Sequence, residues 1–353
     1  MPRPAPRSAP ATPAVTLKDI AARAGVSVMT ASRVLADKGH VSAEKRRIVR
    51  EIASQLGYLP NPMVQRIMSE IRRGRLNACI GTLGWLNTHA SRREWRDIPY
   101  RRHFYEGAIE RAEQLGLHVD EVWAGEPGMT PVRLTQILIS RGIEGLIIPP
   151  QAESAFLTGM DLGRFAVGFI SPPRVPGRWN WAESDNLLAI SLACDAVRSA
   201  GRRRPGLVLA RLHDQPGQGW RAGFLASQDD APVRSRVPIL RLPGSLEEHP
   251  KLYQAWLKKH RPDVVIGCDY RLKPFAEDAG FSVPDQLALV HLHLAEDVEG
   301  WAGVDPLDLQ VGHAATELVA SSLRRNERGE PASPVRVLVP GVWRDGVTLP
   351  PRH

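Results

Sequence analysis

A short segment near the N-terminus constrains the fold more than any other part of the chain. Residues 16–36 show two helical patterns that meet at Gly25 and Ser27. Gly25 can adopt the left-handed backbone that ends a helix, and Ser27 has the side chain of an N-cap that starts the next one. The first helix has an apolar stripe at helical spacing, formed by Leu17, Ile20, Ala21 and Ala24. Two short helices joined in this way predict a helix-turn-helix, which places its second helix in the major groove of DNA.

The residues after this turn complete a three-helix domain. The second helix is expected from about Val28 to Ala36, and a third is expected to be capped by Ser42. The predicted inward positions are Ala31, Val34 and Leu35 on the second helix and Ile48, Ile52 and Leu56 on the third. The positions left pointing outward are Val28, Met29, Ser32 and Arg33. An ordinary helical cap on a larger domain is the alternative, but helix-Gly-Val-Ser-helix is a dense match to the DNA-binding motif.

Charge is distributed unevenly along the chain. Residues 1–76 contain 14 Lys and Arg against 5 Asp and Glu, whereas the remaining residues contain 32 basic and 33 acidic side chains. The positive excess therefore lies on and around the helix-turn-helix, as the neutralisation of DNA phosphates requires. A solvated basic face explains part of this distribution, but not why the larger part of the chain is close to neutral.

A longer pattern surrounds the motif. Val15–Ala21 leads into the turn, and Gly57–Pro62 (Gly-Tyr-Leu-Pro-Asn-Pro) follows the third helix. These runs resemble the LacI/GalR family of bacterial transcription regulators, and the similarity continues from about Val15 to Leu349. The resemblance implies an N-terminal all-α helix-turn-helix DNA-binding domain plus an α/β periplasmic-binding-protein-like core of two subdomains. The implied boundaries are 15–60 for the DNA-binding domain, 61–76 for a hinge helix and linker, and 77–349 for the effector and dimerisation core.

The resemblance also implies roles for residues of the DNA-binding domain. In this family a hinge helix forms when two protomers meet on the operator, and a Leu from each enters the minor groove. Ile67 occupies that position here. Val28 and Met29 would approach base edges and contact thymine methyl groups, while Arg33 would contact a guanine or a phosphate. The residues expected to position phosphates are Thr16, Ser27, Thr30, Ser32 and Asn61. For Thr16 and Ser27, helix capping is the competing explanation.

Composition limits the remaining classes of protein. Residues 1–14 are rich in Pro, Ala and Arg without a hydrophobic face, and we expect a disordered leader rather than a signal peptide. No run approaches the roughly 20 apolar residues of a membrane span. The chain has three widely spaced cysteines, Cys79, Cys194 and Cys268, which fit reduced thiols better than a disulfide framework or a zinc site. These features predict a cytoplasmic protein without a membrane partner.

Beyond residue 77, short apolar strands alternate with amphipathic helices, which predicts parallel sheets with ligands at the carboxyl ends of the strands. The expected strands are 78–86, 118–123, 145–149, 164–170, 206–210, 237–242, 263–267, 288–294 and 335–339. The expected helices are 104–115, 133–140, 186–200, 220–227, 250–259 and 311–325. By the resemblance, the first subdomain is about 77–174 plus 305–334, and the second is about 175–304 plus 335–349.

The expected effector site departs from the family pattern. Sugar-sensing members hold hydroxyl groups with an Arg, an Asn and an Asp at positions occupied here by Trp220, Cys268 and His293. Asp269 keeps the second half of the Asn-Asp step. One hypothesis is an effector-binding pocket lined by these four residues, in which Trp220 stacks on a ligand. A second is a regulator that has lost effector sensing. A third is a metal site that uses His291 and His293, which lie on one face of a strand.

The segment Arg92–Arg102 looks like an insertion before the first helix of the core. In the family this loop borders the cleft, so it can supply Trp95 or Tyr100 to a ligand, or it can be a solvated loop.

Three classes of function follow. The first is a homodimeric transcription regulator, a repressor, that binds a pseudo-palindromic operator and responds to an unknown small-molecule effector in the interdomain cleft. The second is a small-molecule binding protein of the periplasmic type, which the N-terminal motif argues against. The third is an enzyme, for which the chain offers no nucleophile–base pair or metal spacing. We therefore expect no catalytic residues, no resident metal and no cofactor.

Overall fold

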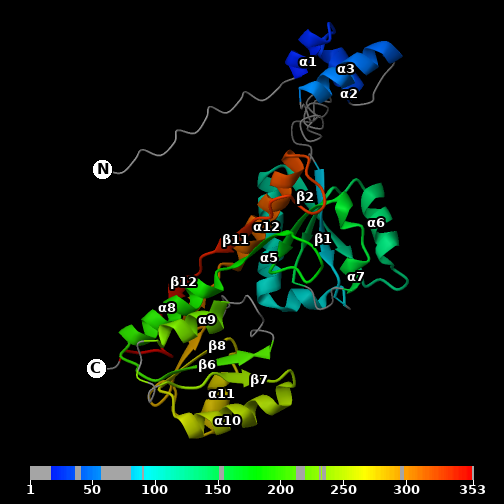
Figure 1. The fold of residues 1–353 in the computed structure, drawn as a ribbon. Coiled ribbons are helices and arrows are strands. Elements are labelled where there is room, and N and C mark those ends of the chain that lie inside the picture. The colour runs from blue at the N-terminus through cyan, green and yellow to red at the C-terminus, as the bar shows by residue number, and fades with distance from the viewer. Residues whose placement is uncertain are drawn as a thin grey trace, which may run out of the picture. The chain divides into compact units, whose positions relative to one another are not determined.

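The computed structural model describes residues 17–35, 41–56, 81–89, 91–150, 155–211, 219–229, 232, 236–294 and 298–351 (Figure 1). The chain divides near residue 80 into two compact units, a helical head and a core. The expected hinge at 61–76 and the leader at 1–14 lie outside the described residues. Within the described part, no helix is long and apolar enough to cross a membrane.

The head contains three helices, α1 (Leu17–Arg23), α2 (Val28–Leu35) and α3 (Ala43–Gln55). They enclose a small core of residues that are almost fully buried, namely Ile20, Ala21, Ala31, Val34, Val49 and Ala53. The prediction for α3 was wrong by one position, because Val49 and Ala53 form its buried stripe while Ile48 is only half-buried. Ile52 and Leu56 pack against the edge of this core, as expected.

The first sheet of the core has the strand order β11-β5-β4-β3-β1-β2, and all its strands are parallel. Its strands are β1 (Gly81–Asn87), β2 (Leu117–Trp123), β3 (Gly145–Ile148), β4 (Ala166–Ile170), β5 (Asn180–Ser184) and β11 (Arg336–Val339). Helix α6 (Pro131–Ser140) and the short α7 (Ala155–Thr158) cover one face, where Leu134, Leu138 and Leu157 join the apolar core. Helices α5 (Pro99–Gln114) and α12 (Asp308–Arg324) belong to the same half of the core.

The second sheet has the order β12-β10-β9-β8-β6-β7, in which only the β10–β12 pair is antiparallel among the described strands. Its strands are β6 (Pro205–Ala210), β7 (Leu240–Leu242), β8 (Val264–Gly267), β9 (Ala288–His291), β10 (Ala302–Asp305) and β12 (Val342–Arg344). Helices α8 (Asn186–Ser199) and α9 (Gly219–Ser227) bury one face of this sheet. Helices α10 (His249–His260) and α11 (Leu272–Asp278) bury the other.

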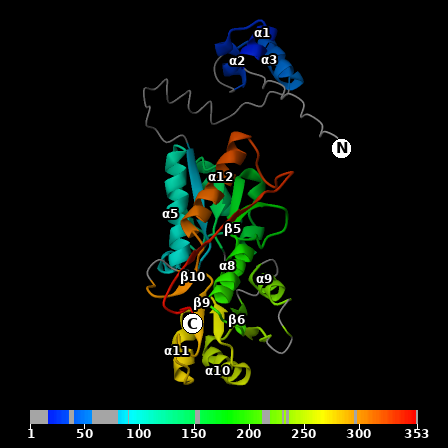
Figure 2. The ribbon, with the colours of Figure 1, turned by 90° about the vertical axis from the view of Figure 1, so that its left-hand side faces the viewer.

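The chain passes between the two sheets three times, after β5, after β10 and after β11. The C-terminal segment can be followed in red from the first sheet to the second (Figure 2). These crossings move the expected boundaries of the subdomains. The expected second subdomain includes residues 175–304, but β5 pairs with β4, so the first sheet extends to Ser184. It also includes residues 335–349, but β11 pairs with β5 of the first sheet, and β12 is the strand of this range that pairs with β10.

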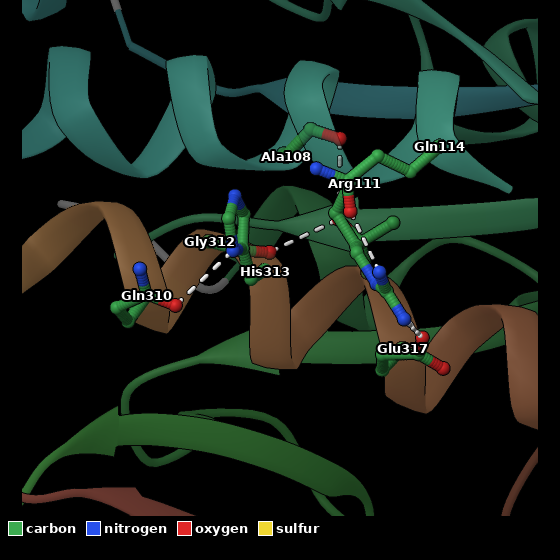
Figure 3. A network of polar contacts seen from close by, with 8 residues as sticks. Ala108, Arg111, Gln114, Gln310, Gly312, His313 and Glu317 are labelled. Carbon is green, nitrogen blue, oxygen red and sulfur yellow. Dashed lines mark hydrogen bonds and ion pairs between the residues drawn. The ribbon is translucent and has the colours of Figure 1, made fainter.

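Helices α5 and α12 meet at two glycines, of which Gly312 is labelled in Figure 3. A Cβ atom added at Gly107 would lie 2.0 Å from the carbonyl oxygen of Leu309, and one at Gly312 would lie 2.2 Å from that of Phe104. Arg111 Nε donates to Glu317 Oε1 at 2.8 Å, which joins the two helices one turn away. The absence of side chains at both crossing points allows backbone to meet backbone, and the half-buried ion pair sets the register.

Candidate DNA-binding surface and effector site

The turn between α1 and α2 has the geometry that its sequence predicts. Gly25 has φ +62°, in the left-handed region, so a residue with a Cβ would be strained there. The backbone N–H of Thr30 donates to Ser27 Oγ at 3.1 Å, which makes Ser27 the N-cap of α2. The two hydroxyl groups of Ser27 and Thr30 also lie 2.8 Å apart. Capping of α2 by Ser27 is therefore confirmed, and the same exposed hydroxyl group remains at the surface.

The outward face of α2 carries the residues expected to read DNA. Val28 and Met29 are 46% and 57% exposed, which leaves both apolar side chains available for contact. Arg33 is exposed one turn further along the helix. Thr16, Asn61, Ile67 and the side chain of Ser32 lie outside the described residues, so their expected roles remain predictions.

Helix α3 adds a basic surface to the head. Ser42 occupies the N-cap position, but its side chain makes no capping hydrogen bond, so the predicted cap was wrong. An open hollow lies along the first turns of this helix, lined by Val41, Ala43, Arg46, Arg47, Arg50 and Glu51. Arg47 pairs with Glu51 at 3.1 Å, and both side chains are largely exposed. Such a surface favours an anionic partner through diffuse attraction rather than through one built contact.

The four residues expected at the effector site lie in different surroundings. Trp220 is only 5% exposed and belongs to the apolar core formed by α8, α9 and the second sheet. Its ring is occupied by packing, so its position gives the stacking hypothesis no support. Cys268 and Asp269 directly follow β8, and His293 lies two residues after β9. These three residues are thus at the carboxyl ends of parallel strands, where ligands of α/β folds bind.

The chemistry of Cys268 and Asp269 is set by their neighbours. Burial, with the negative charges of Asp269 and Asp308, raises the pKa of the Cys268 thiol to about 12. Burial also tends to raise the pKa of Asp269, but hydrogen bonds from the side chain and backbone of Arg271 outweigh it and hold the value below the usual range. Arg271 Nη2 lies 2.6 Å from Asp269 Oδ2. Asp269 is therefore an ionised group that already has a cationic partner.

His293 connects the two halves of the core. Its Nε2 lies 2.8 Å from Oδ2 of Asp308, the first residue of α12. Its ring also meets the ring of Tyr100, near the start of α5, edge to face with centroids 5.6 Å apart. We call Tyr100, Arg101, His293 and Asp308 the His293 cluster. It brings together a strand end of the second sheet and the first turns of both glycine-packed helices.

His291 and His293 do not point their ring nitrogens at a common site. The ring of His291 stacks on Tyr270, with centroids 3.9 Å apart and planes inclined by 5°. The backbone N–H of His293 donates to His291 Nδ1 at 3.1 Å, so this nitrogen is an acceptor and is engaged within the chain. No group of three or more potential metal ligands comes together in the described parts of the chain. The positions of His291 and His293 therefore give the metal hypothesis no support.

The segment Arg92–Arg102 packs against the first sheet, so part of it is buried and is not a solvated loop. Trp95 is 2% exposed and contacts Trp85 and Tyr105. Glu121 on β2 accepts hydrogen bonds from Trp95 Nε1 at 3.1 Å and from Arg96 Nη2 at 2.6 Å. This anchoring leaves Tyr100, rather than Trp95, next to His293. Burial, followed by the charge of Glu121, raises the pKa of Tyr105.

Sequence reasoning did not single out Asp308. It is the acidic residue in the first turn of the last long helix, a position that favours a carboxylate through the helix dipole. An acid shortly before the expected helix 311–325 was the available indication. The resemblance placed the change of subdomain near residue 305, but it did not indicate that Asp308 would reach a histidine of the other half.

Comparison with known proteins agrees with this architecture. Residues 16–61 match the family described as "Bacterial regulatory proteins, lacI family". The maltose regulon regulatory protein MalI of Escherichia coli (strain K12) is 26% identical over 196 residues, which are 54% of this chain and 52% of that protein. The lactose operon repressor of the same organism is 32% identical over 136 residues, 38% of this chain and 34% of that protein. The chain thus spans about half or less of the length of these relatives.

Solved structures resemble nearly the whole fold. The transcriptional regulator CelR–cellobiose complex has a TM-score of 0.57 at 18% identity and covers 95% of this chain and 99% of that chain. The lac repressor dimer bound to operator and the anti-inducer ONPF has a TM-score of 0.55 at 19% identity, with the same coverage. The three-helix head and the core of two mainly parallel sheets define the fold as a helix-turn-helix domain followed by a periplasmic-binding-protein-like core. The helix-turn-helix segment, residues 16–61, matches the lacI family of bacterial regulatory proteins, and the core shares the fold of the solved regulators.

Proposed function

We propose that this protein is a sequence-specific transcription repressor. In this proposal it acts in the cytoplasm and binds a pseudo-palindromic operator as a homodimer. The observation that carries the proposal is helix α2, which presents Val28, Met29 and Arg33 on an exposed face behind a capped turn. The basic excess of residues 1–76 supports it, because phosphate contacts provide most of the non-specific affinity for DNA. The hinge around Ile67 is part of the proposal, with Ile67 as the minor-groove wedge.

We propose further that a small molecule bound between the two halves of the core controls DNA binding. The His293 cluster supports this part. Its residues lie at strand ends and helix starts that belong to different sheets, so a ligand held there acts on both halves at once. Such a ligand shifts the populations of two arrangements only if it binds one of them better. We propose no catalytic activity.

The experiment that tests DNA recognition is selection of bound duplexes from a random DNA library with the full chain at physiological salt. A recovered pseudo-palindrome with a central pyrimidine–purine step supports the dimeric, wedging repressor. Absence of any enriched sequence contradicts the proposal.

The selected duplex then allows a test of Arg33. We expect Arg33→Ala to weaken binding to it by about 1–3 kcal/mol, with little change for scrambled DNA, because a base contact is lost. Arg198→Ala is the matched control, because Arg198 is an exposed arginine on α8 of the core whose guanidinium pairs with Asp195. An equal loss on both duplexes would make Arg33 a phosphate contact.

A further inference from the structure

One acceptor in the His293 cluster lacks a donor. Asp308 is 7% exposed, and its Oδ2 is engaged by His293. Its Oδ1 is buried and has no hydrogen-bond partner among the residues that the structure describes. A buried carboxylate oxygen without a donor is costly, and native proteins satisfy such atoms with water or with a ligand. The group that completes this site must therefore present an N–H or O–H to Oδ1.

One cation in the same cluster lacks an acid. Arg101 is half-buried, its Nε donates to Tyr100 Oη at 3.2 Å, and its Nη1 lies 3.2 Å from His89 Nε2. No carboxylate pairs with it in the described ranges of the chain, unlike the next residue, whose guanidinium lies 3.7 Å from Glu106. The Arg101 guanidinium sits 5.6 Å from the centroid of the Tyr100 ring.

These two groups are connected by aromatic rings. Arg101 lies over Tyr100, Tyr100 meets the ring of His293, and His293 holds Asp308. The cluster thus offers an acceptor at one end and a guanidinium at the other. A guanidinium binds carboxylates through paired N–H groups, which gives it a preference for planar anions. A water molecule would satisfy Asp308 Oδ1 but would leave the cation without an anion.

Other ligands fit these groups less well. A metal cation would need several carboxylate, thiolate or imidazole ligands, yet Asp269 is paired with Arg271 and His291 is stacked on Tyr270. A neutral apolar molecule would leave both polar ends unmatched. A simple anion would match the guanidinium and be repelled by the carboxylate.

We propose that the His293 cluster binds a small polyhydroxylated carboxylic acid. A hydroxyl group of this ligand donates to Asp308 Oδ1, and its carboxylate accepts hydrogen bonds from Arg101. This inference rests on the proposed function, because it names the chemical class of the effector that controls the repressor.

Matched pairs of ligands test the proposal on the full chain. The acids are D-glycerate, D-erythronate, D-ribonate and D-gluconate, and each is compared by calorimetry with its polyol (glycerol, erythritol, ribitol or glucitol). We expect at least one acid to bind at least tenfold more tightly than its polyol. Asp308→Asn should weaken that binding at least tenfold, and Arg101→Gln should reduce the affinity for the acid to that of the polyol. Arg102→Gln is the matched control, with unchanged binding.

Each other result overturns the proposal. If no acid binds, or every acid binds no better than its polyol, the ligand class is wrong. If Asp308→Asn binds the acid as well as the unaltered chain does, Oδ1 holds only water. Should Asp308→Asn fail to fold, the Arg101→Gln result decides, since that side chain is only half-buried. Duplex selection with the same preparation separates the two proposals, because a chain that selects an operator but binds no acid retains the regulatory function and loses only this ligand class.

Discussion

The glycine crossing of α5 and α12 permits a quantitative prediction. An alanine at position 107 would place its Cβ 2.0 Å from the carbonyl oxygen of Leu309, whereas a carbon needs about 3.3 Å from such an oxygen. The clash is with backbone, so no rotamer change relieves it and the helices must separate by roughly 1 Å. Overpacking of this kind costs up to about 3 kcal/mol. Alanine regains about 1 kcal/mol through its higher helix propensity. The expected net loss of stability is about 2 kcal/mol.

Thermal unfolding of the core, followed by calorimetry on the full chain, measures this loss. A decrease of about 2 kcal/mol corresponds to a melting temperature lower by about 4–8 °C for a unit of this size. Gly244→Ala is the control, because a Cβ there meets nothing within 4 Å. Gly312→Ala should cost a similar amount, and the double variant should lose less than the sum, since helices already separated accommodate the second methyl group. A neutral or stabilising Gly107→Ala, or strict additivity, would refute the reasoning.

Two further predictions concern titratable groups next to the His293 cluster. The pKa of Asp269 is lower in the folded than in the unfolded chain. The ionised carboxylate therefore makes its full contribution to the free energy of unfolding above the pKa of the unfolded chain. This contribution is lost as the pH falls through the pKa of the folded chain. The stability difference between the unaltered chain and Asp269→Asn, measured by urea unfolding, should therefore be constant above about pH 5 and shrink below pH 4; a difference independent of pH down to pH 2 would contradict it. Because burial raises the pKa of Cys268 to about 12, its alkylation by iodoacetamide at pH 8 should be at least about a hundredfold slower than that of a free cysteine, by peptide mass spectrometry. Alkylation at the free-thiol rate would show that the thiol is solvated.

Most core elements were predictable because their apolar patterns are strong. The expected strand 145–149 and helix 186–200 are observed as Gly145–Ile148 and Asn186–Ser199. Strands β5, β10 and β12 were missed for a common physical reason. They are three to five residues long, and residues such as Asn180, Glu183 and Gly303 give them no apolar run. These three strands form because they pair with strands that are distant in sequence, and not because of local β-propensity.

The two candidate sites differ in how far the sequence determines them. The turn of the helix-turn-helix depends on residues a few positions apart, so Gly25 and Ser27 could be assigned correctly from the sequence. The His293 cluster depends on where the chain changes sheets. Position in the chain indicated His293, but not that Asp308 would reach it or that Trp220 would be enclosed in the core. Long-range topology, rather than residue type, decides these contacts.

The repeated passage of the chain between the sheets has a consequence during protein synthesis. The first sheet needs β11 as its edge partner for β5, but β11 is translated roughly 150 residues later. At about 5–20 residues per second, β5 emerges from the ribosome roughly 8–30 s before its outer neighbour exists. During that interval the exposed edge of β5 is open to pairing with another nascent chain, a hazard that unpaired strands share. The helical head has no such delay, because all its packing partners lie within 40 residues, and it can fold while the core is still being made.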